Sequence, residues 1–468
     1  MSTKNQRLIL LAILLLSVLL RVGVALYLGD STPPAKDETS YSTLAARLAA
    51  GHGFSFDRPW YPFTAAEAPT AHWSFLETIY LGGIYAAGGG VHPLSARLLT
   101  ALLCGILMPW LTYRLARRVL GLGTSGTSRR QTGHGDQLPL VAAALAAVYP
   151  YFVLYGAMVQ TEAFFICALL WSLERALAVG EALRSRSRSR STGEPGLNLS
   201  LSLSLSLGLS LGIATLLRQS VLPWVAVVLA WLLYVGYRYR VVRMAVVVIL
   251  TSTLTLSLLL VPFTARNVRA YGQFLLLNSN AGYAMYSAQH PMHGTSFQEF
   301  AAAPLPADLV SRGLNEAQWD RELMRRGIGF VLADPGRYLL LSLSRAGDYF
   351  DFLPNPDTSL LHNLGRLGSF GLFLPFMLYG IFLEVKGKAK GEDRAKDEAR
   401  GPFLTSALAL TLAFVIFYSL LHIFTWAMPR YRLPVDAVLL IFAAQGLVDL
   451  ACRVPQVLRR APLAAHEI

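Results

Sequence analysis

Asp37 and Glu38 are adjacent acidic residues that follow the first long apolar stretch of the chain. A carboxylate within hydrogen-bond reach of a substrate proton can act as a general base, and a neighbouring carboxylate can position it. Residues 44–54 then place apolar side chains at helical spacing and include Gly51, which predicts an amphipathic helix that ends there. Such a pair could act on a substrate held at a membrane face. The alternative is a pair of solvated acids that favour a helix amino terminus.

A third acidic residue, Glu162, follows Thr161 at a short turn between two apolar stretches. An acid at the mouth of a helix pair is costly unless it is solvated or paired. Two interpretations stay open, namely a helix cap and a second acid that faces the same outer pocket as Asp37. Together with Tyr41, Glu162 is assigned to positioning the acceptor or the acids.

Three arginines lie at the predicted outer ends of apolar stretches, namely Arg218, Arg266 and Arg432. Positive charge is normally scarce in short outer loops. A guanidinium group binds phosphate oxygens in a bidentate manner, so these residues are predicted to bind a donor phosphate. The alternative is that they reach lipid headgroups along their aliphatic stems, which is the interpretation preferred for Arg269. Arg430 lies beside Arg432 and receives no separate assignment.

The histidines and cysteines give little support for a metal site. Only His290 and His293 have ligand-like spacing, and they lie in a loop beside proline and glycine. The three cysteines show neither a metal spacing nor a disulfide framework. No cofactor is therefore predicted, although the need for a divalent cation stays open.

Several aromatic residues follow the acidic pair within the first long polar segment. They suit an aromatic belt at the membrane interface, and some could also serve as platforms for sugar rings. The belt is the preferred interpretation. These residues are Tyr41, Trp60, Tyr61, Trp73 and Tyr80.

The composition is that of an integral membrane protein. Hydrophobic residues make up 54% of the chain and charged residues 15%, and the mean hydropathy is +0.45. Apolar runs of about 20 residues recur, which is the length that crosses a bilayer as a helix. The fold class is therefore an all-α polytopic membrane protein. The formal net charge of +13 comes largely from basic loops between these runs, so no nucleic-acid partner is predicted.

The apolar runs predict about ten transmembrane helices. Arg- and Lys-rich loops place both termini on the cytoplasmic side of the plasma membrane. Two long extracytoplasmic loops then carry interfacial helices. The predicted crossings are 8–28, 95–113, 138–156, 162–179, 198–217, 220–236, 243–263, 366–385, 402–424 and 433–451. The predicted division is a first helix in 1–28, a first outer loop in 29–94, helices in 95–263, a second outer loop in 264–365, and helices with a cytoplasmic tail in 366–468.

Two segments need separate interpretation. The amino-terminal run could be a cleaved signal peptide, but no clean cleavage pattern follows it, so a retained helix is expected, with Arg21 reaching the interface. Residues 338–352 are short for a crossing and are interrupted by charges, so they are predicted to form an interfacial helix. Whether they cross the membrane stays open.

The order of these motifs resembles the bacterial polyprenyl- or dolichyl-phosphate-sugar glycosyltransferases of the integral-membrane clan C. That group includes protein O-mannosyltransferases and the lipid A aminoarabinose transferase. The resemblance covers most of the membrane region. It rests on several short motifs that occur in the expected order and on the expected side of the membrane. They are Asp37–Glu38, Thr161–Glu162, Leu217–Arg218, Arg266–Asn267 with Tyr271–Gly272, and Tyr431–Arg432–Leu433–Pro434.

The resemblance implies an inverting glycosyltransferase that uses a polyprenyl-phosphate-linked sugar and an acceptor protein, lipid or glycan. Asp37 would be the catalytic base, with Glu38 beside it, and the sugar would be a hexose or a pentose. The chain departs from the family pattern at 69–77, where a proline-rich motif is common, and at Gln219, where proline is usual. These departures bear on the acceptor and on local geometry.

Two other functions remain as alternatives. A multi-pass transporter would be expected to show inverted repeats and charges at mid-membrane, whereas this chain shows no internal repeat and carries its charges near helix ends. A polysaccharide ligase or polymerase that uses a lipid-linked glycan would share the outer-face acids and arginines. The number of helices cannot separate it from a glycosyltransferase.

Overall fold

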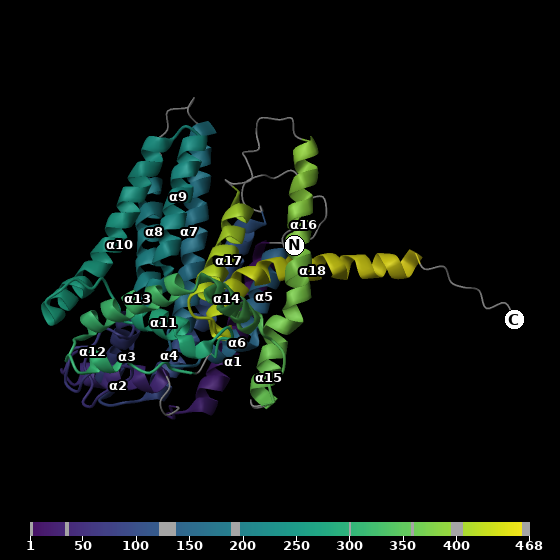
Figure 1. The fold of residues 1–468 in the computed structure, drawn as a ribbon. Coiled ribbons are helices and arrows are strands. Elements are labelled where there is room, and N and C mark those ends of the chain that lie inside the picture. Colours follow the sequence, from purple (N-terminus) through teal and green to yellow (C-terminus); the bar gives the residue numbers. More distant parts are fainter. Residues whose placement is uncertain are drawn as a thin grey trace.

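The computed structural model describes residues 3–32, 37–120, 137–188, 197–298, 301–356, 360–394 and 406–460. These residues form helices and contain no β-strand, only two isolated bridges. The long apolar helices pack into a bundle that contains one large hydrophobic core (Figure 1). The chain is thus an all-α polytopic membrane protein, as the sequence predicts.

Helices form at every predicted crossing, although residues 402–405 of the ninth crossing lie outside the described residues. Eight described helices are long and apolar enough to span a membrane, and two further apolar helices, at 138–148 and 201–217, are shorter. The count of about ten crossings therefore stays a prediction. The helices are α1 (Thr3–Leu28), α4 (Pro93–Val119), α5 (Leu138–Val148), α6 (Pro150–Tyr155), α7 (Glu162–Arg188), α8 (Leu197–Leu217), α9 (Leu222–Arg238), α10 (Val242–Tyr271), α15 (Leu360–Arg366), α16 (Leu372–Arg394), α17 (Ala407–Phe424) and α18 (Leu433–Arg460).

The two predicted outer loops contain the remaining helices, most of which gather at one end of the bundle (Figure 1). In the first loop α2 packs against α3, and in the second α11 packs against α13. Exposed leucines on α14, at 339, 340 and 343, fit the predicted interfacial helix. The elements are α2 (Asp37–Ala49), α3 (Phe75–Gly88), α11 (Ala281–Gln289), α12 (Ala307–Val310), α13 (Glu316–Ala333) and α14 (Pro335–Phe350).

Glu316 joins the two outer loops. Its buried carboxylate accepts hydrogen bonds from the Thr64 hydroxyl at 2.5 Å and from the Ala71 amide at 2.8 Å, both in the first loop. It also accepts one from the Ser279 hydroxyl at 2.7 Å in the second loop. Because a buried carboxylate requires several donors, this residue fixes the relative position of the two loops.

The third apolar segment is broken between α5 and α6, and Arg21 donates hydrogen bonds to carbonyl groups at this break. Pro150 has no N–H, so it cannot donate to the carbonyl of Ala146. The Arg21 guanidinium donates to that carbonyl at 3.3 Å and to the Ala147 carbonyl at 3.1 Å. The prediction that Arg21 reaches the membrane interface is wrong, because its side chain is fully buried. It turns inward because the broken helix offers carbonyl acceptors that lipid does not.

Replacing Arg21 by leucine is expected to destabilise the protein. The substitution leaves two buried carbonyls without their side-chain donor, at a cost of about 1–3 kcal/mol each. The melting temperature in detergent should fall by several degrees, whereas Arg7→Leu, on the exposed start of the same helix, should have a small effect. An unchanged melting temperature for Arg21→Leu would show that these carbonyls find other donors.

Candidate functional site

Asp37 lies at the first position of α2 and pairs with Arg430, which is 393 residues further along the chain. Arg430 belongs to the 3₁₀ helix η8 (Pro429–Arg432), just before α18. One of its Nη atoms donates to Asp37 Oδ2 at 2.7 Å. The side chain of Asp37 is 35% exposed, so its carboxylate remains accessible to a ligand.

Glu162 and Arg218 form a second ion pair beside the first. Glu162 begins α7, and Arg218 lies between α8 and the short helix η4 (Gln219–Val221). Arg218 donates to Glu162 Oε1 at 2.5 Å and to the Thr161 hydroxyl at 3.0 Å. Arg430 approaches the same Glu162 oxygen at 3.7 Å. Asp37, Glu162, Arg218 and Arg430 therefore form one group, here called the outer charge cluster.

The outer charge cluster places two guanidinium groups near one aromatic ring. Arg218 lies 5.2 Å and Arg430 5.4 Å from the centre of the Tyr431 ring. Stacking and ion pairing hold both guanidinium groups close together, where they could bind the oxygens of one phosphate. Chemically, the cluster therefore combines an accessible carboxylate with a pair of anion-binding groups.

Glu38 has a different ionic partner from Asp37 and is only 2% exposed. It pairs with Arg97 at 2.7 Å and accepts a hydrogen bond from the Val159 amide at 3.1 Å. Arg97 also donates to the carbonyls of Ala157 at 3.1 Å and of Ser31 at 2.7 Å. The pair therefore ties the start of α2 to α4 and to the turn before α7, and α2 and α7 carry Asp37 and Glu162 respectively.

Tyr41 is buried beside the outer charge cluster. Its hydroxyl accepts a hydrogen bond from the Ser74 amide at 3.4 Å, and its ring meets Trp73 edge to face at 5.4 Å. Burial raises the pKa of Tyr41, the negative charge of Asp37 raises it further, and Arg218 opposes this. Tyr41 thus stays a neutral hydroxyl within electrostatic reach of both ion pairs.

The other two predicted phosphate ligands have different partners. Arg266 donates to the Phe54 carbonyl at 3.3 Å, and its guanidinium lies 5.7 Å from the centre of the Phe75 ring. Arg432 is 1% exposed, donates to Asp436 at 3.1 Å and lies 3.6 Å above the Phe370 ring. The contacts described for both residues thus lie outside the outer charge cluster.

Sequence reasoning did not select Arg430 or Arg97. The two arginines of η8 are two residues apart, so a 3₁₀ turn directs them to different sides, and the spacing alone does not say which faces the acids. Arg97 did carry a signal, because it lies in the first turns of α4 at the predicted outer face, where positive charge is scarce.

Glu77 on α3 is a buried acid that has no ionic partner among the described residues. Its side chain is 1% exposed, and neither carboxyl oxygen has a hydrogen-bond partner there. Burial, and then the negative charge of Glu162, raises the pKa of Glu77 to about 8. Glu77 is therefore a protonated carboxyl at neutral pH.

Glu77→Gln is expected to stabilise the protein increasingly as the pH rises. Between about 4.5 and about 8, the folded protein keeps a proton on Glu77 that the unfolded chain releases. Folding stability of the wild type therefore falls by about 1.4 kcal/mol for each pH unit in this window, relative to a residue that does not titrate. Thermal unfolding from pH 5 to 9 should show the difference between the two proteins growing up to about pH 8 and then levelling off. A constant difference would show that Glu77 is ionised throughout.

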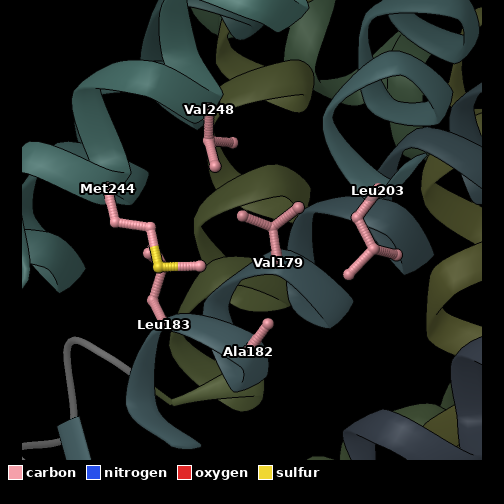
Figure 2. Close-up of a pocket in the computed structure, with 6 residues that line it drawn as sticks. All are labelled: Val179, Ala182, Leu183, Leu203, Met244 and Val248. Carbon is pink, nitrogen blue, oxygen red and sulfur yellow. The ribbon is translucent and has the colours of Figure 1, made fainter. Parts of the chain in front are cut away.

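Neither metal ligation nor the apolar pocket of the bundle accounts for the charged site. The described residues contain no group of three or more His, Cys, Asp or Glu side chains that could hold a metal ion. His293 instead pairs through Nε2 with the Ser287 carbonyl at 3.0 Å. The pocket in Figure 2 is a shallow apolar gap between α7, α8 and α10, with no polar side chain in its lining. It is lined by Val179, Ala182, Leu183, Leu203, Met244 and Val248.

The fold is that of a polytopic membrane protein with acids and arginines gathered near the ends of its apolar helices. It is similar to the archaeal oligosaccharyltransferase AglB from Archaeoglobus fulgidus in complex with an inhibitory peptide and a dolichol-phosphate, at a TM-score of 0.56 and 15% identity. The match covers 98% of this chain and 52% of that chain. The apo form of the A. fulgidus enzyme gives a TM-score of 0.55 at 14% identity, with the same coverage.

A third structure of the A. fulgidus enzyme, tethered to an acceptor peptide that contains the NVT sequon, gives a TM-score of 0.54 at 14% identity. This match covers 98% of this chain and 52% of that chain. The chain thus spans about half the length of these neighbours. No family model and no curated protein matches the sequence. The likeness is one of fold: this chain shares the fold of these oligosaccharyltransferase structures, in agreement with the polytopic helical fold predicted from the sequence.

Proposed function

We propose that this protein is an inverting glycosyltransferase that moves a sugar from a polyprenyl-phosphate carrier to an acceptor at the extracytoplasmic membrane face. The observation that carries the proposal is the outer charge cluster, in which Asp37, Glu162, Arg218 and Arg430 converge from four distant segments. The AglB structure with a bound dolichol-phosphate supports a lipid phosphate as the anionic partner of these arginines.

In this mechanism Asp37 is the general base. It removes the proton from an acceptor hydroxyl or amine while that atom forms a bond to the anomeric carbon. The bond between the anomeric carbon and the phosphate oxygen breaks on the opposite face, which inverts the configuration. A phosphate leaves without protonation, so no second carboxyl is needed as an acid, in contrast to glycoside hydrolysis.

Arg218 and Arg430 stabilise the negative charge that grows on the leaving phosphate. Arg430 is paired with Asp37 in this structure, so a phosphate that draws Arg430 away also frees the Asp37 carboxylate to accept a proton. Glu162 keeps the two guanidinium groups together from the opposite side. The incoming donor phosphate thus replaces Asp37 as the partner of Arg430, which leaves the Asp37 carboxylate free to act as the base.

The remaining predicted residues take supporting roles in this proposal. Glu38 positions Asp37 through its pairing with Arg97, and Tyr41 supports the acceptor side. Arg432 anchors η8 through Asp436 and so orients Arg430, and Arg266 contributes positive charge near the first outer loop. The acceptor is a protein, lipid or glycan, and the protein lies in the plasma membrane with both termini in the cytoplasm.

The direct test is to incubate the purified full chain with a panel of lipid-phosphate-linked hexoses and pentoses and to measure the release of lipid phosphate. The name of the AglB neighbours, oligosaccharyltransferase, makes a lipid-linked oligosaccharide the second donor class to include. Release from at least one monosaccharide donor supports the proposal. Release from the oligosaccharide donors alone would favour the ligase or polymerase alternative, and transport of substrate without release would favour a transporter.

A further inference from the structure

Residues 71–74 of the first outer loop are held rigidly by donors and acceptors from other segments. The Ala71 amide donates to Glu316, and Asn278 Nδ2 donates to the carbonyls of Ala71 at 3.1 Å and Trp73 at 2.7 Å. The Ser74 hydroxyl donates to the Leu216 carbonyl at 2.9 Å. With its backbone held on several sides, this segment presents its side chains in fixed positions.

Three side chains in and just after this segment have unused hydrogen-bonding atoms. The indole N–H of Trp73 and Nδ1 of His72 are buried and have no partner in the described structure, as is also true of both Glu77 oxygens. The His72 ring bonds the backbone of Ser279, which leaves Nδ1 as an acceptor on a side chain that is 8% exposed. Buried polar atoms normally bond to protein, water or a ligand, and the four atoms here all belong to residues 72–77, where one ligand could contact them together.

These side chains lie close to the outer charge cluster. Trp73 packs edge to face against Tyr41, which lies one turn along α2 from Asp37. The His72 ring meets Trp73 edge to face at 5.3 Å, so it lies on the side of the site that holds Tyr41 and the proposed base. Glu77 lies in the first turn of α3, whose N-cap residue Ser74 donates its hydroxyl to the carbonyl of Leu216, two residues before Arg218. A ligand that contacts His72 and Glu77 therefore extends from the base to the phosphate-binding arginines.

We propose that His72, Trp73 and Glu77 form the subsite that binds the hydroxyl groups of the transferred sugar. This inference rests on the proposed function, because the sugar is the part of the donor that lies between the base and the phosphate. Trp73 is a donor, His72 Nδ1 is an acceptor, and a protonated Glu77 is both. A sugar hydroxyl matches this mixture because it both donates and accepts hydrogen bonds. A phosphate would require donors only, and an isoprenoid tail would require neither donors nor acceptors.

The same geometry argues against assigning Trp73 to the interfacial aromatic belt. A belt tryptophan directs its N–H to water or headgroups, whereas the N–H of Trp73 is buried and its ring packs against Tyr41 and His72. Tyr41 in turn lies within electrostatic reach of Asp37 and Arg218. Trp73 therefore belongs to the interior of the site.

The test compares the dissociation constants of the purified protein for polyprenyl phosphate and for the same lipid carrying each hexose or pentose of the donor panel. Trp73→Phe removes the N–H and keeps the aromatic ring. It is expected to weaken binding of the sugar-linked lipid about tenfold, the value of one hydrogen bond, and to leave binding of the sugar-free lipid within about twofold. Glu77→Leu is expected to act in the same way, and Glu77→Gln should restore most of the loss because its amide also donates and accepts.

Trp60→Phe is the matched control, because the N–H of Trp60 already donates to the Ser40 hydroxyl at 3.0 Å in the same loop. It should leave the ratio of the two dissociation constants unchanged. The inference is overturned if Trp73→Phe and Glu77→Leu weaken both lipids equally, or neither. If the wild type binds both lipids equally and releases no lipid phosphate, the proposed function fails as well, so the two failures are distinguishable.

Discussion

Asp37→Asn is expected to reduce kcat/KM for sugar transfer by about 10²- to 10⁴-fold, which is the usual contribution of a general base. Asparagine has the same shape and can still accept a hydrogen bond from Arg430, but it cannot take a proton. The variant should therefore insert, melt near the wild-type temperature and bind the sugar-linked lipid. The measurement is the initial rate of lipid-phosphate release with saturating acceptor.

Asp57→Asn is the matched control for this experiment. Asp57 lies in the same outer loop and is exposed, and its replacement should leave transfer unchanged. Full transfer by Asp37→Asn would remove the assigned base. Glu162 would then be the remaining acid of the outer charge cluster, although both arginines already engage its carboxylate.

Local elements could be predicted because their signals lie within a few residues of one another. Helix α2 begins at Asp37 and ends before Gly51, whose φ of +86° suits glycine, as the spacing of apolar residues predicts. The apolar runs became helices because a lipid-exposed backbone must satisfy its own hydrogen bonds. Charge at the ends of these runs is visible in the sequence as well, and it marks Asp37, Glu162 and Arg218 as candidates.

The partners of these charges could not be predicted because they come from distant segments. Nothing near Glu38 in the sequence indicates that its carboxylate is buried against Arg97 on α4, whereas the neighbouring Asp37 pairs with Arg430. Arg21 was misjudged for a related reason. Its acceptors are carbonyls released by a proline more than 100 residues away, so its inward orientation depends on how α1 packs against α5.

The two arginines of η8 show how far sequence reasoning reached. The segment was identified as a candidate site, but Arg432 was chosen over Arg430. The choice depends on Asp436, which lies one helical turn beyond Arg432 and also accepts a hydrogen bond from Tyr149 at 2.8 Å. This buried pair occupies Arg432 and leaves Arg430 to face the acids.

Arg430→Gln is expected to impair catalysis, whereas Arg432→Gln is expected to impair stability. Arg430→Gln removes one donor to the leaving phosphate, so kcat/KM should fall about 10²- to 10³-fold and binding of sugar-free polyprenyl phosphate should weaken, with little change in melting temperature. Arg432→Gln leaves the buried carboxylate of Asp436 without its cation, which costs about 3–5 kcal/mol, so its main effect should be a lower melting temperature.

Arg269→Gln serves as the control for both variants, because this arginine is an exposed residue near the end of α10. Thermal unfolding and lipid-phosphate release should be measured on all three proteins in the same detergent. The reverse pattern, with Arg430→Gln unstable but active and Arg432→Gln stable but inactive, would assign phosphate binding to Arg432. Because the two residues share one short helix, such a result would mean that η8 rotates when the donor binds and exchanges the partners of its two arginines.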